Sequence, residues 1–474
     1  MKKMFVLPVV VAGSLALSGC FDGSSSSSIP TTSTPTTQVR VLHGVSDAPL
    51  VNIGINGANA IEGADYKDAG VLNPEVGTYE VTVNGILPGG ATTTVIGPAS
   101  LTFAEGINYD IIASGNLGDE SIAPIILEDD GEFIDASMAR LRVVHLSQDA
   151  QMAAMGGPVD VYLTLASDGD VLPADPSFTF SFGENVGPLE VAAETYRIRV
   201  TPADDDTVVY DSGSVPLPAG ADLLVAAIDN TVYGDAPVSL LIVNGDVTTE
   251  ILNAGTGAGI RAVHNSSDVG NVDIYVNAEP DGSSAAVNDL AFGETVPTFP
   301  ITGEYVQLAT GENRVAVTGT GGTAAAIDET LNLAAGDLRT IIAAGSVGGE
   351  IEALVFPDDN RGVATAAKLR VIHGAVEAQV VDVYLVPAAD AGEGVGNAEP
   401  ALPNFAYGTS SGYLNVAAGG YVVFITDTDG NELFQSGTLM LETGGVYTAV
   451  ARLNNGGGSD ATITALDDFV VAPI

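Results

Sequence analysis

The sequence of 474 residues contains a single cysteine, no tryptophan and only 15 basic residues against 60 acidic ones. One cysteine excludes an internal disulfide framework and any cysteine-rich zinc or iron–sulfur site. The formal net charge of −45 argues against nucleic-acid binding, because phosphate recognition requires clustered lysine and arginine. Hydrophobic residues make up 46% of the chain, so it can bury cores, and we expect several folded domains.

The only cysteine, Cys20, ends a short N-terminal segment with the features of a secretion signal. Two lysines provide its positive start, and residues 4–17 form an apolar stretch shorter than the roughly 20 residues that span a membrane. Residues 17–20, Leu-Ser-Gly-Cys, are similar to the lipobox of bacterial lipoproteins, which implies cleavage before Cys20 and its lipidation. Phe21, in place of an aspartate, then implies the outer membrane. The alternatives are a signal peptide with an incidental cysteine and an uncleaved anchor.

The main feature of the remaining chain is a strand pattern that occurs four times. All four histidines of the chain take part, at intervals of 102, 119 and 109 residues. Each histidine follows an arginine by three residues and precedes an acid by four. The four sets are Arg40, His43 and Asp47; Arg142, His145 and Asp149; Arg261, His264 and Asp268; and Arg370, His373 and Glu377. A period of roughly 100 residues indicates four copies of a domain, because solenoid repeats are only ~20–50 residues long.

Each copy consists of short β-branched or aromatic runs between Gly, Pro, Asn and Asp, without a helical period. A second strand carries Asp-x-Tyr at residues 160–162, 273–275 and 382–384, whereas copy one has Asn52-Ile53-Gly54. Roughly seven strands in ~100 residues is typical of an immunoglobulin-like β-sandwich. We therefore predict an all-β protein of four tandem immunoglobulin-like β-sandwich modules.

The predicted organisation has six parts. They are a lipoprotein signal peptide at 1–20, a flexible Ser/Thr/Pro tether at 21–38, and β-sandwich modules at 39–135, 140–254, 259–362 and 368–474. Because the joins between the modules are short, we expect a semi-rigid rod.

The Arg-x-x-His strand, the Asp-Val-Tyr strand and the later strands entered through glycine turns together resemble the bacterial envelope domain known as domain of unknown function 4397. The resemblance covers almost the whole mature chain, although copy one lacks the Asp-Val-Tyr motif. It implies an immunoglobulin-like fold and an envelope role. It implies no established activity and no catalytic residues.

Each histidine and its following acid are candidates for a metal pair or an acid–base couple. The alternative is structural: the histidine ends its strand and hydrogen-bonds to the acid that shapes the next turn. We favour the structural role, because a catalytic site needs unlike residues gathered once, whereas these occur at equivalent places in four copies. A zinc site also needs three or four ligands, and no module has a second histidine or a cysteine. We therefore predict no catalytic residue and no cofactor.

The repeated arginines are predicted to form cross-strand ion pairs with the aspartates of the second strand. The expected pairs are Arg142–Asp160, Arg261–Asp273 and Arg370–Asp382. A line of arginines that binds an acidic ligand is the alternative, and the surrounding negative charge disfavours it.

Asp427 and Asp429 are weak candidates for a calcium site. The segment that they begin resembles the start of a calcium-binding loop, but Thr438 stands where the twelfth-position glutamate would be. Because Asp-Gly between two apolar runs is a hairpin signal, we favour a turn and predict no metal.

The predicted function is a non-enzymatic, lipid-anchored envelope protein that acts as a spacer, adhesion or interaction scaffold. We expect it to contact the outer membrane through its anchor and a protein or glycan ligand through its loops and edge strands, and not to bind nucleic acid. One alternative is a hydrolase or glycan-processing protein, in which one module alone has an acid cluster or deep pocket. The other is an adhesin that calcium stiffens at the module joins.

Overall fold

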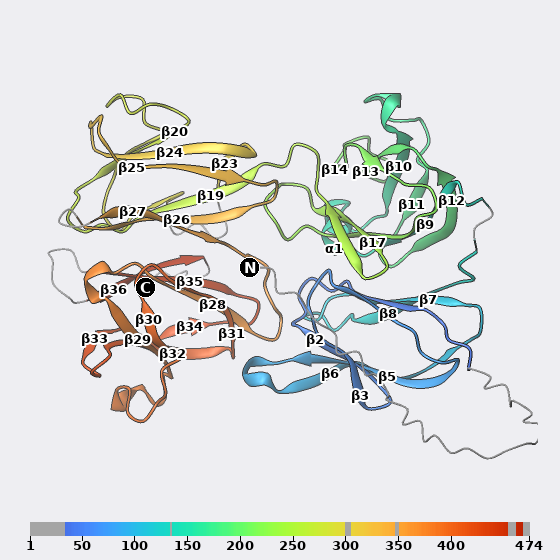
Figure 1. Cartoon of the computed structure of the whole chain (residues 1–474), viewed down its shortest axis with the longest axis horizontal. Helices are drawn as coiled ribbons and strands as arrows, with labels where there is room; N and C mark the ends of the chain where they lie inside the picture. Colours follow the sequence, from blue (N-terminus) through green and yellow to red (C-terminus); the bar gives the residue numbers. More distant parts are fainter. Residues whose placement is uncertain (1–33, 133–134, 299–304, 347–349, 454–460, 468–474) are drawn as a thin grey trace, which may run out of the picture. The chain divides into compact units, whose positions relative to one another are not determined.

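Each of the four copies folds into two facing β-sheets, and the predicted all-β series of sandwiches is confirmed (Figure 1). The computed structural model describes residues 34–132, 135–298, 305–346, 350–453 and 461–467. Cys20, the signal segment and most of the tether lie outside these residues. From Thr36 onward the chain is a single compact unit. In the described ranges, no helix is long and apolar enough to cross a membrane.

Repeat 1 shows the plan, and all of its residues from 36 to 132 are described. It has eight strands rather than about seven, in two four-stranded sheets of order β4-β1-β7-β8 and β3-β2-β5-β6. The elements are β1 (Val39–His43), β2 (Val51–Ile55), β3 (Ala58–Ala64), β4 (Ala69–Leu72), β5 (Gly77–Ile86), the 3-10 turn η1 (Pro88–Gly90), β6 (Thr92–Phe103), β7 (Asn108–Ser114) and β8 (Ala123–Asp129).

Repeat 2 adds a short helix and a fifth strand to each sheet. Its sheets have the order β12-β9-β16-β17-β18 and β11-β10-β13-β14, with β15 also paired to β13. The elements are β9 (Met138–His145), α1 (Gln148–Ala153), β10 (Val159–Leu165), η2 (Ala166–Asp168), β11 (Phe178–Phe180), β12 (Asn185–Ala192), β13 (Thr195–Pro202), β14 (Tyr210–Asp211), β15 (Val215–Pro216), β16 (Asp222–Asp229), β17 (Val238–Asn244) and β18 (Val247–Ile251).

Repeats 3 and 4 keep the same two-sheet plan. The sheets of repeat 3 are β22-β19-β26-β27, with β23 paired to β19, and β21-β20-β24-β25. Those of repeat 4 are β31-β28-β35-β36 and β30-β29-β32-β33, with β34 paired to β32. The elements of repeat 3 are β19 (Ala258–His264), β20 (Val272–Val276), β21 (Val287–Leu290), β22 (Thr295–Val296), β23 (Val306–Leu308), β24 (Gly311–Gly319), β25 (Ala325–Leu333), β26 (Leu338–Gly345) and β27 (Ile351–Pro357). Those of repeat 4 are β28 (Ala367–His373), η3 (Val376–Ala378), β29 (Val380–Pro387), η4 (Ala391–Glu393), β30 (Leu402–Ala406), β31 (Ser410–Val416), β32 (Gly419–Asp427), β33 (Glu432–Gln435), β34 (Leu439–Leu441), β35 (Val446–Leu453) and β36 (Ala461–Asp467).

The sheet that contains the Arg-x-x-His strand, here called the histidine sheet, is buried on both faces. In β1, Val39 and Val41 face the core of their own sandwich, while Leu42 belongs to a second cluster that includes residues of repeat 2. This follows from the alternation of side chains along a strand. One face of each histidine sheet therefore closes its own sandwich, and the other packs against a neighbouring repeat.

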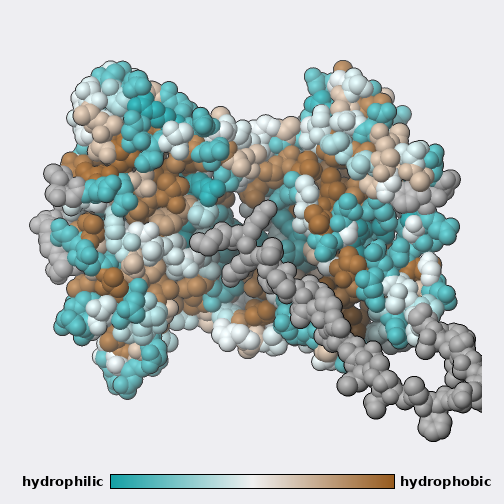
Figure 2. All heavy atoms as spheres, in the orientation of Figure 1, coloured by the Kyte–Doolittle hydropathy of each residue, from teal (hydrophilic) through white to brown (hydrophobic). Residues whose placement is uncertain are grey.

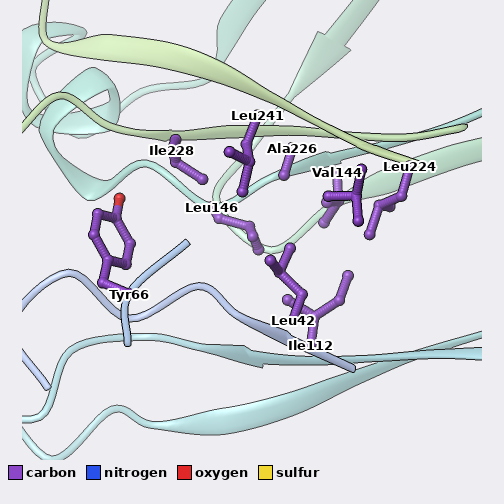
Figure 3. Packing of buried hydrophobic residues seen from close by; sticks show 10 residues of the cluster. Leu42, Tyr66, Ile112, Val144, Leu146, Leu224, Ala226, Ile228 and Leu241 are labelled. Carbon is purple, nitrogen blue, oxygen red and sulfur yellow. The ribbon is translucent and has the colours of Figure 1, made fainter. Parts of the chain in front are cut away.

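Two apolar clusters join the repeats in pairs. Between repeats 1 and 2, Leu42 and Ile112 lie against Val144, Leu146 and other buried side chains of the second repeat (Figure 3). Between repeats 3 and 4, an equivalent cluster contains Val263, Ile342, Ile372 and Val450. Complete burial of such side chains contributes roughly 1.5–3 kcal/mol each, so these clusters stabilise the pairs substantially.

Repeats that are not neighbours in the sequence also touch. Arg361, in the join before β28, donates to the carbonyl oxygens of Ser46 (3.1 Å) and Ala48 (2.9 Å) in repeat 1. The amide of Ala364 donates to the carbonyl of Asp47 at 2.8 Å. The predicted rod, in which each module would contact only its sequence neighbours, is therefore wrong. The short joins allow the histidine sheets of two repeats to pack against each other. This packing is favoured because it buries the apolar face of each histidine sheet that points away from its own sandwich.

Candidate functional site

The repeated arginines lie at the boundaries between repeats. They stand on the face of the histidine sheet that points away from its own sandwich, and they are almost inaccessible to solvent. Their exposed fractions are 6% for Arg40, 5% for Arg142, 6% for Arg261 and 0% for Arg370. A buried guanidinium needs carboxylate or carbonyl partners, and here the paired repeats supply them.

Between repeats 1 and 2, two arginines share one carboxylate. Arg40 Nε lies 2.6 Å from Asp110 Oδ1, and Arg142 Nη1 of the second repeat lies 2.9 Å from Asp110 Oδ2. Arg142 Nη2 also pairs with Asp222 in its own repeat at 2.8 Å. The two repeats are further joined by the ion pairs Arg140–Asp129 and Lys67–Glu250.

Between repeats 3 and 4, two arginines again meet two aspartates. Arg370 Nη1 lies 2.6 Å from Asp358 Oδ1, and Arg261 of the third repeat pairs with Asp467 of the fourth. Arg261 Nε lies 3.4 Å from Asp358, so this carboxylate is shared. Tyr305 donates its hydroxyl to Asp358 Oδ2 at 2.8 Å. The charges are balanced, and their partners are held in fixed positions, as burial of ions requires.

The predicted pairs of these arginines with the aspartates of the second strand are wrong. Arg142 lies on β9 and Asp160 on β10, and these strands belong to different sheets of the sandwich; the same holds for the other two pairs. Asp160 instead accepts from the Thr179 hydroxyl at 2.5 Å. The other two carboxylates accept from the backbone amides of residues in the left-handed conformation, in the bonds Asp273–Asp289 and Asp382–Asn404.

Repeat 1, which lacks the Asp-Val-Tyr motif, uses an amide oxygen for the same purpose. Asn52 Oδ1 accepts from the backbone amide of Gly63 at 2.9 Å, and Gly63 has a φ of 64°. In repeats 1, 3 and 4 the bond joins the second strand to the strand that follows it, at a place where the pairing of these two strands is irregular. The departure in copy one is therefore a substitution that preserves the bond.

Each histidine holds the turn that follows its strand. The Nδ1 atom of His43 accepts from the backbone amide two residues later, at 3.4 Å, and the other histidines do the same at 3.3–3.5 Å. The Nε2 atoms of His43 and His264 donate to the carbonyl oxygens of Pro49 (3.2 Å) and Gly270 (2.7 Å). Both ring nitrogens of these two histidines therefore bond to the backbone, and the prediction that the following acid is their partner is wrong.

The four imidazole rings are uncharged at neutral pH. Burial lowers the pKa of all four, to about 4 for His145 and His373. A ring that is neutral and carries its proton on Nε2 accepts at Nδ1, which agrees with the observed bonds.

An aromatic residue from a later turn packs beside each histidine; this turn precedes the strand that pairs antiparallel with the histidine strand. Ring centroids are 6.1–6.5 Å apart in the pairs His43–Tyr66, His145–Phe182, His264–Phe292 and His373–Tyr407. The next residue donates its amide to the histidine carbonyl; it is glycine in three repeats and Lys67 in repeat 1. Lys67 has a φ of 74°, close to the values of 77–84° for the three glycines. Repeat 1 has lysine where the other three repeats have glycine, so the sequence alone does not reveal that all four repeats share this turn.

The four acids of the pattern have different surroundings. The carboxylate of Asp47 accepts from the amides of Leu117 and Gly118, both at 2.8 Å. Asp149 lies in the first turn of α1, Asp268 in the turn after β19 and Glu377 in η3.

The weak calcium candidate forms a hairpin turn. Asp427, at the end of β32, accepts from the amides of Asp429 (3.0 Å) and Asn431 (2.8 Å) and from the Asn431 side chain (2.7 Å). These bonds, first the one from the Asn431 side chain, lower the pKa of Asp427. Among the residues that the structure describes, no group of three or more His, Cys, Asp or Glu is placed to hold a metal ion.

The chain matches the family described as domain of unknown function (DUF4397) over residues 37–162, 151–275, 258–384 and 385–474. The chain belongs to this family. The resemblance inferred from the repeated motifs is thus confirmed, and copy one lies within the first DUF4397 match. No curated protein matches the chain. In this DUF4397 protein, the arginine of the repeated motif joins repeats and the histidine fixes a turn.

Proposed function

We propose that this DUF4397 protein is a non-enzymatic, lipid-anchored scaffold of the cell envelope, in which paired β-sandwiches present their outer loops and edges to a partner. One observation carries the proposal. The side chains best suited to bind or act on a substrate are the repeated arginines and histidines. They are buried, and they form ion pairs and hydrogen bonds within and between repeats. They are therefore engaged in assembly rather than open to a substrate.

Charge supports the envelope role and the need for an anchor. A net charge of −45 repels anionic headgroups, so attachment to the outer membrane would depend on lipid at Cys20. Figure 2 shows hydrophilic residues interspersed with hydrophobic patches over the face in view. Most of the basic residues are used in ion pairs, which favours a protein or glycan partner over an anionic polymer such as nucleic acid.

The hydrolase alternative would need a distinct acid pair in one repeat, and repeat 2 does have one in Asp149 and Asp229. However, Asp229 is only 9% exposed and accepts hydrogen bonds from the hydroxyls of Ser46 and Ser147. A carboxylate that is occupied in this way is poorly placed to act on a substrate. We therefore propose a structural role for this pair as well.

The anchor is tested by labelled palmitate and by membrane fractionation of cells that express the full chain. Wild type should incorporate label and sediment with outer membranes, whereas Cys20→Ala should do neither. The matched control is Cys20→Ala combined with Ser24→Cys, which keeps one thiol but moves it out of the lipobox. Incorporation of label into either variant would refute the anchor.

The absence of catalysis is tested on purified wild type and Asp149→Asn with panels of glycan and ester substrates. Both proteins should stay at the background rate. A rate above background that the substitution abolishes would establish the hydrolase alternative.

A further inference from the structure

A cavity of about 60 Å³ lies between the two sheets of repeat 2. Most of its wall is formed by residues of β9, β16 and β17 from the histidine sheet and of β10, β11 and β13 from the opposite sheet. Val143, Val161 and Ala227 face this core but are only partly buried, because they border the cavity. Protein interiors seldom leave voids larger than a water molecule, which needs about 10–15 Å³, so this core is incompletely filled.

The side chains at two core positions explain the space. In repeat 1, Phe103 and Tyr109 pack ring against ring, with centroids 5.1 Å apart. Phe103 precedes the glycine of the following turn by three residues, and Tyr109 pairs with the residue four before the histidine. The same positions of repeat 2 hold Leu217, which lines the cavity, and Leu223. Smaller aliphatic side chains thus replace two aromatic rings.

A smaller cavity, of about 40 Å³, occupies the equivalent place in repeat 3. In both repeats, three alternate residues of the first strand line the cavity: Leu141, Val143 and His145 in repeat 2, and Ile260, Ala262 and His264 in repeat 3. Repeat 3 also has a leucine, Leu333, at the position of Phe103. The cavity is therefore a property of the module core, and it is larger in repeat 2 than in repeat 3.

The wall of the repeat 2 cavity suits an apolar occupant better than water. Every side chain in it is aliphatic or phenyl except that of His145, which is only 3% exposed. His145 Nδ1 accepts from the Ser147 amide, and its Nε2 has no hydrogen-bond partner among the described residues. A buried water typically makes about three hydrogen bonds, and this wall offers one at most. Of the acids that the structure describes, none lines this cavity, so it does not provide the site that the hydrolase alternative needs.

The cavity is also elongated. Leu141 and His145 both line it and lie four residues apart on β9, which corresponds to about 13 Å of strand. A volume of about 60 Å³ along this length leaves only a narrow channel. Such a channel matches a linear alkyl chain better than a compact ring.

We propose that repeat 2 binds a short linear alkyl chain between its two sheets. Burial of methylene groups against the apolar wall drives the binding, and no protein group has to give up a hydrogen bond. This binding is a function separate from the proposed scaffold role, because the buried arginines that join the repeats take no part in the wall.

The test is a titration of the full chain with n-hexane, followed by NMR of selectively labelled histidines. His145 lines the cavity of repeat 2, whereas His43 and His373 line neither cavity, so the chain contains its own controls. Hexane should shift the His145 signal to saturation and leave the signals of His43 and His373 unchanged. The His264 signal should respond only at higher hexane concentration, because its cavity is smaller.

Two other probes with the same number of carbon atoms define the class of ligand. Cyclohexane is compact, and hexanediol carries a hydroxyl at each end. Both should bind more weakly than hexane, cyclohexane because it is too wide for the channel and hexanediol because its hydroxyls would lose water without gaining partners.

Leu217→Phe, which introduces the residue of repeat 1, should weaken hexane binding about tenfold, the factor expected when two methylene groups lose their place in the cavity. Leu333→Phe is the matched control in repeat 3 and should leave the His145 response unchanged. If Leu217→Phe does not fold, Ala227→Val narrows the same cavity from β16. A His145 signal that ignores saturating hexane, equal shifts of all four histidines, or equal binding of hexane and either analogue would overturn the proposal.

Discussion

The guanidinium of Arg370 in repeat 4 lies 2.6 Å from the carboxylate of Asp358, the residue that follows the last strand of repeat 3, and both side chains are fully buried. Arg370 Nη1 also donates to the carbonyl of Pro357 at 2.8 Å. A buried ion pair adds little stability over an apolar contact, but removal of one partner leaves an uncompensated charge and costs about 3–5 kcal/mol. Each pair of repeats is therefore stable only if the buried arginine of one repeat meets a carboxylate of the other.

Lys67 provides a separate test of the turn beside the histidine. Replacement by glycine removes the ion pair with Glu250 but relieves the left-handed backbone, whereas replacement by alanine removes the ion pair and keeps the strain. We expect Lys67→Ala to be less stable than Lys67→Gly by about 1 kcal/mol, as measured by chemical denaturation. Equal stabilities of the two variants would contradict the assigned conformation.

The buried imidazoles predict a specific pH dependence. Because burial lowers the pKa of His145 and His373 to about 4, protonation favours the unfolded chain, where histidine titrates near 6.5. This contribution to stability is complete above pH 6.5 and is lost as the pH falls toward 4. NMR titration of selectively labelled histidines should show neutral rings down to about pH 5. Titration of these rings near 6.5 would contradict their burial.

Calcium should have no effect on the hairpin at Asp427. Its carboxylate is already bonded to Asp429 and Asn431 in a local turn. The melting temperature of chelator-treated protein should therefore remain the same when calcium is added. Asp427→Ala should lower stability to the same extent with and without calcium, because the turn loses its hydrogen bonds. A rise of several degrees that requires Asp427 would instead support a calcium-stiffened adhesin.

The fold class and the repeats were predictable because they depend on local patterns. Side chains alternate along a strand, so Leu141 and Val143 are expected on one face and Arg142 and Val144 on the other, and the structure has this arrangement. The apolar residue on the arginine face was a signal of two-sided burial, since a sheet open to solvent would be polar there. That signal could have predicted the pairing of repeats.

The partners of the arginines were not predictable from one sequence. Asp467 lies 206 residues from Arg261, and no local pattern distinguishes it from the other acids of the chain. The cross-strand hypothesis failed because consecutive strands in a sandwich often belong to opposite sheets, so that Arg142 and Asp160 cannot meet. The hydrogen bonds that Asp229 of repeat 2 accepts from the hydroxyls of Ser46 and Tyr66 were not predictable for the same reason, because these two residues belong to repeat 1.

The pairing of repeats through buried arginines is tested most directly by hydrogen exchange of full-length Arg370→Met. Arg314→Met is the matched control, because Arg314 forms its ion pairs with Asp328 and Glu279 at the surface of one repeat, where such pairs contribute little to stability. We predict faster exchange in β27 of repeat 3 and β35 of repeat 4 together, with repeats 1 and 2 and the control unchanged. Faster exchange confined to repeat 4, or an equal effect of Arg314→Met, would contradict the account.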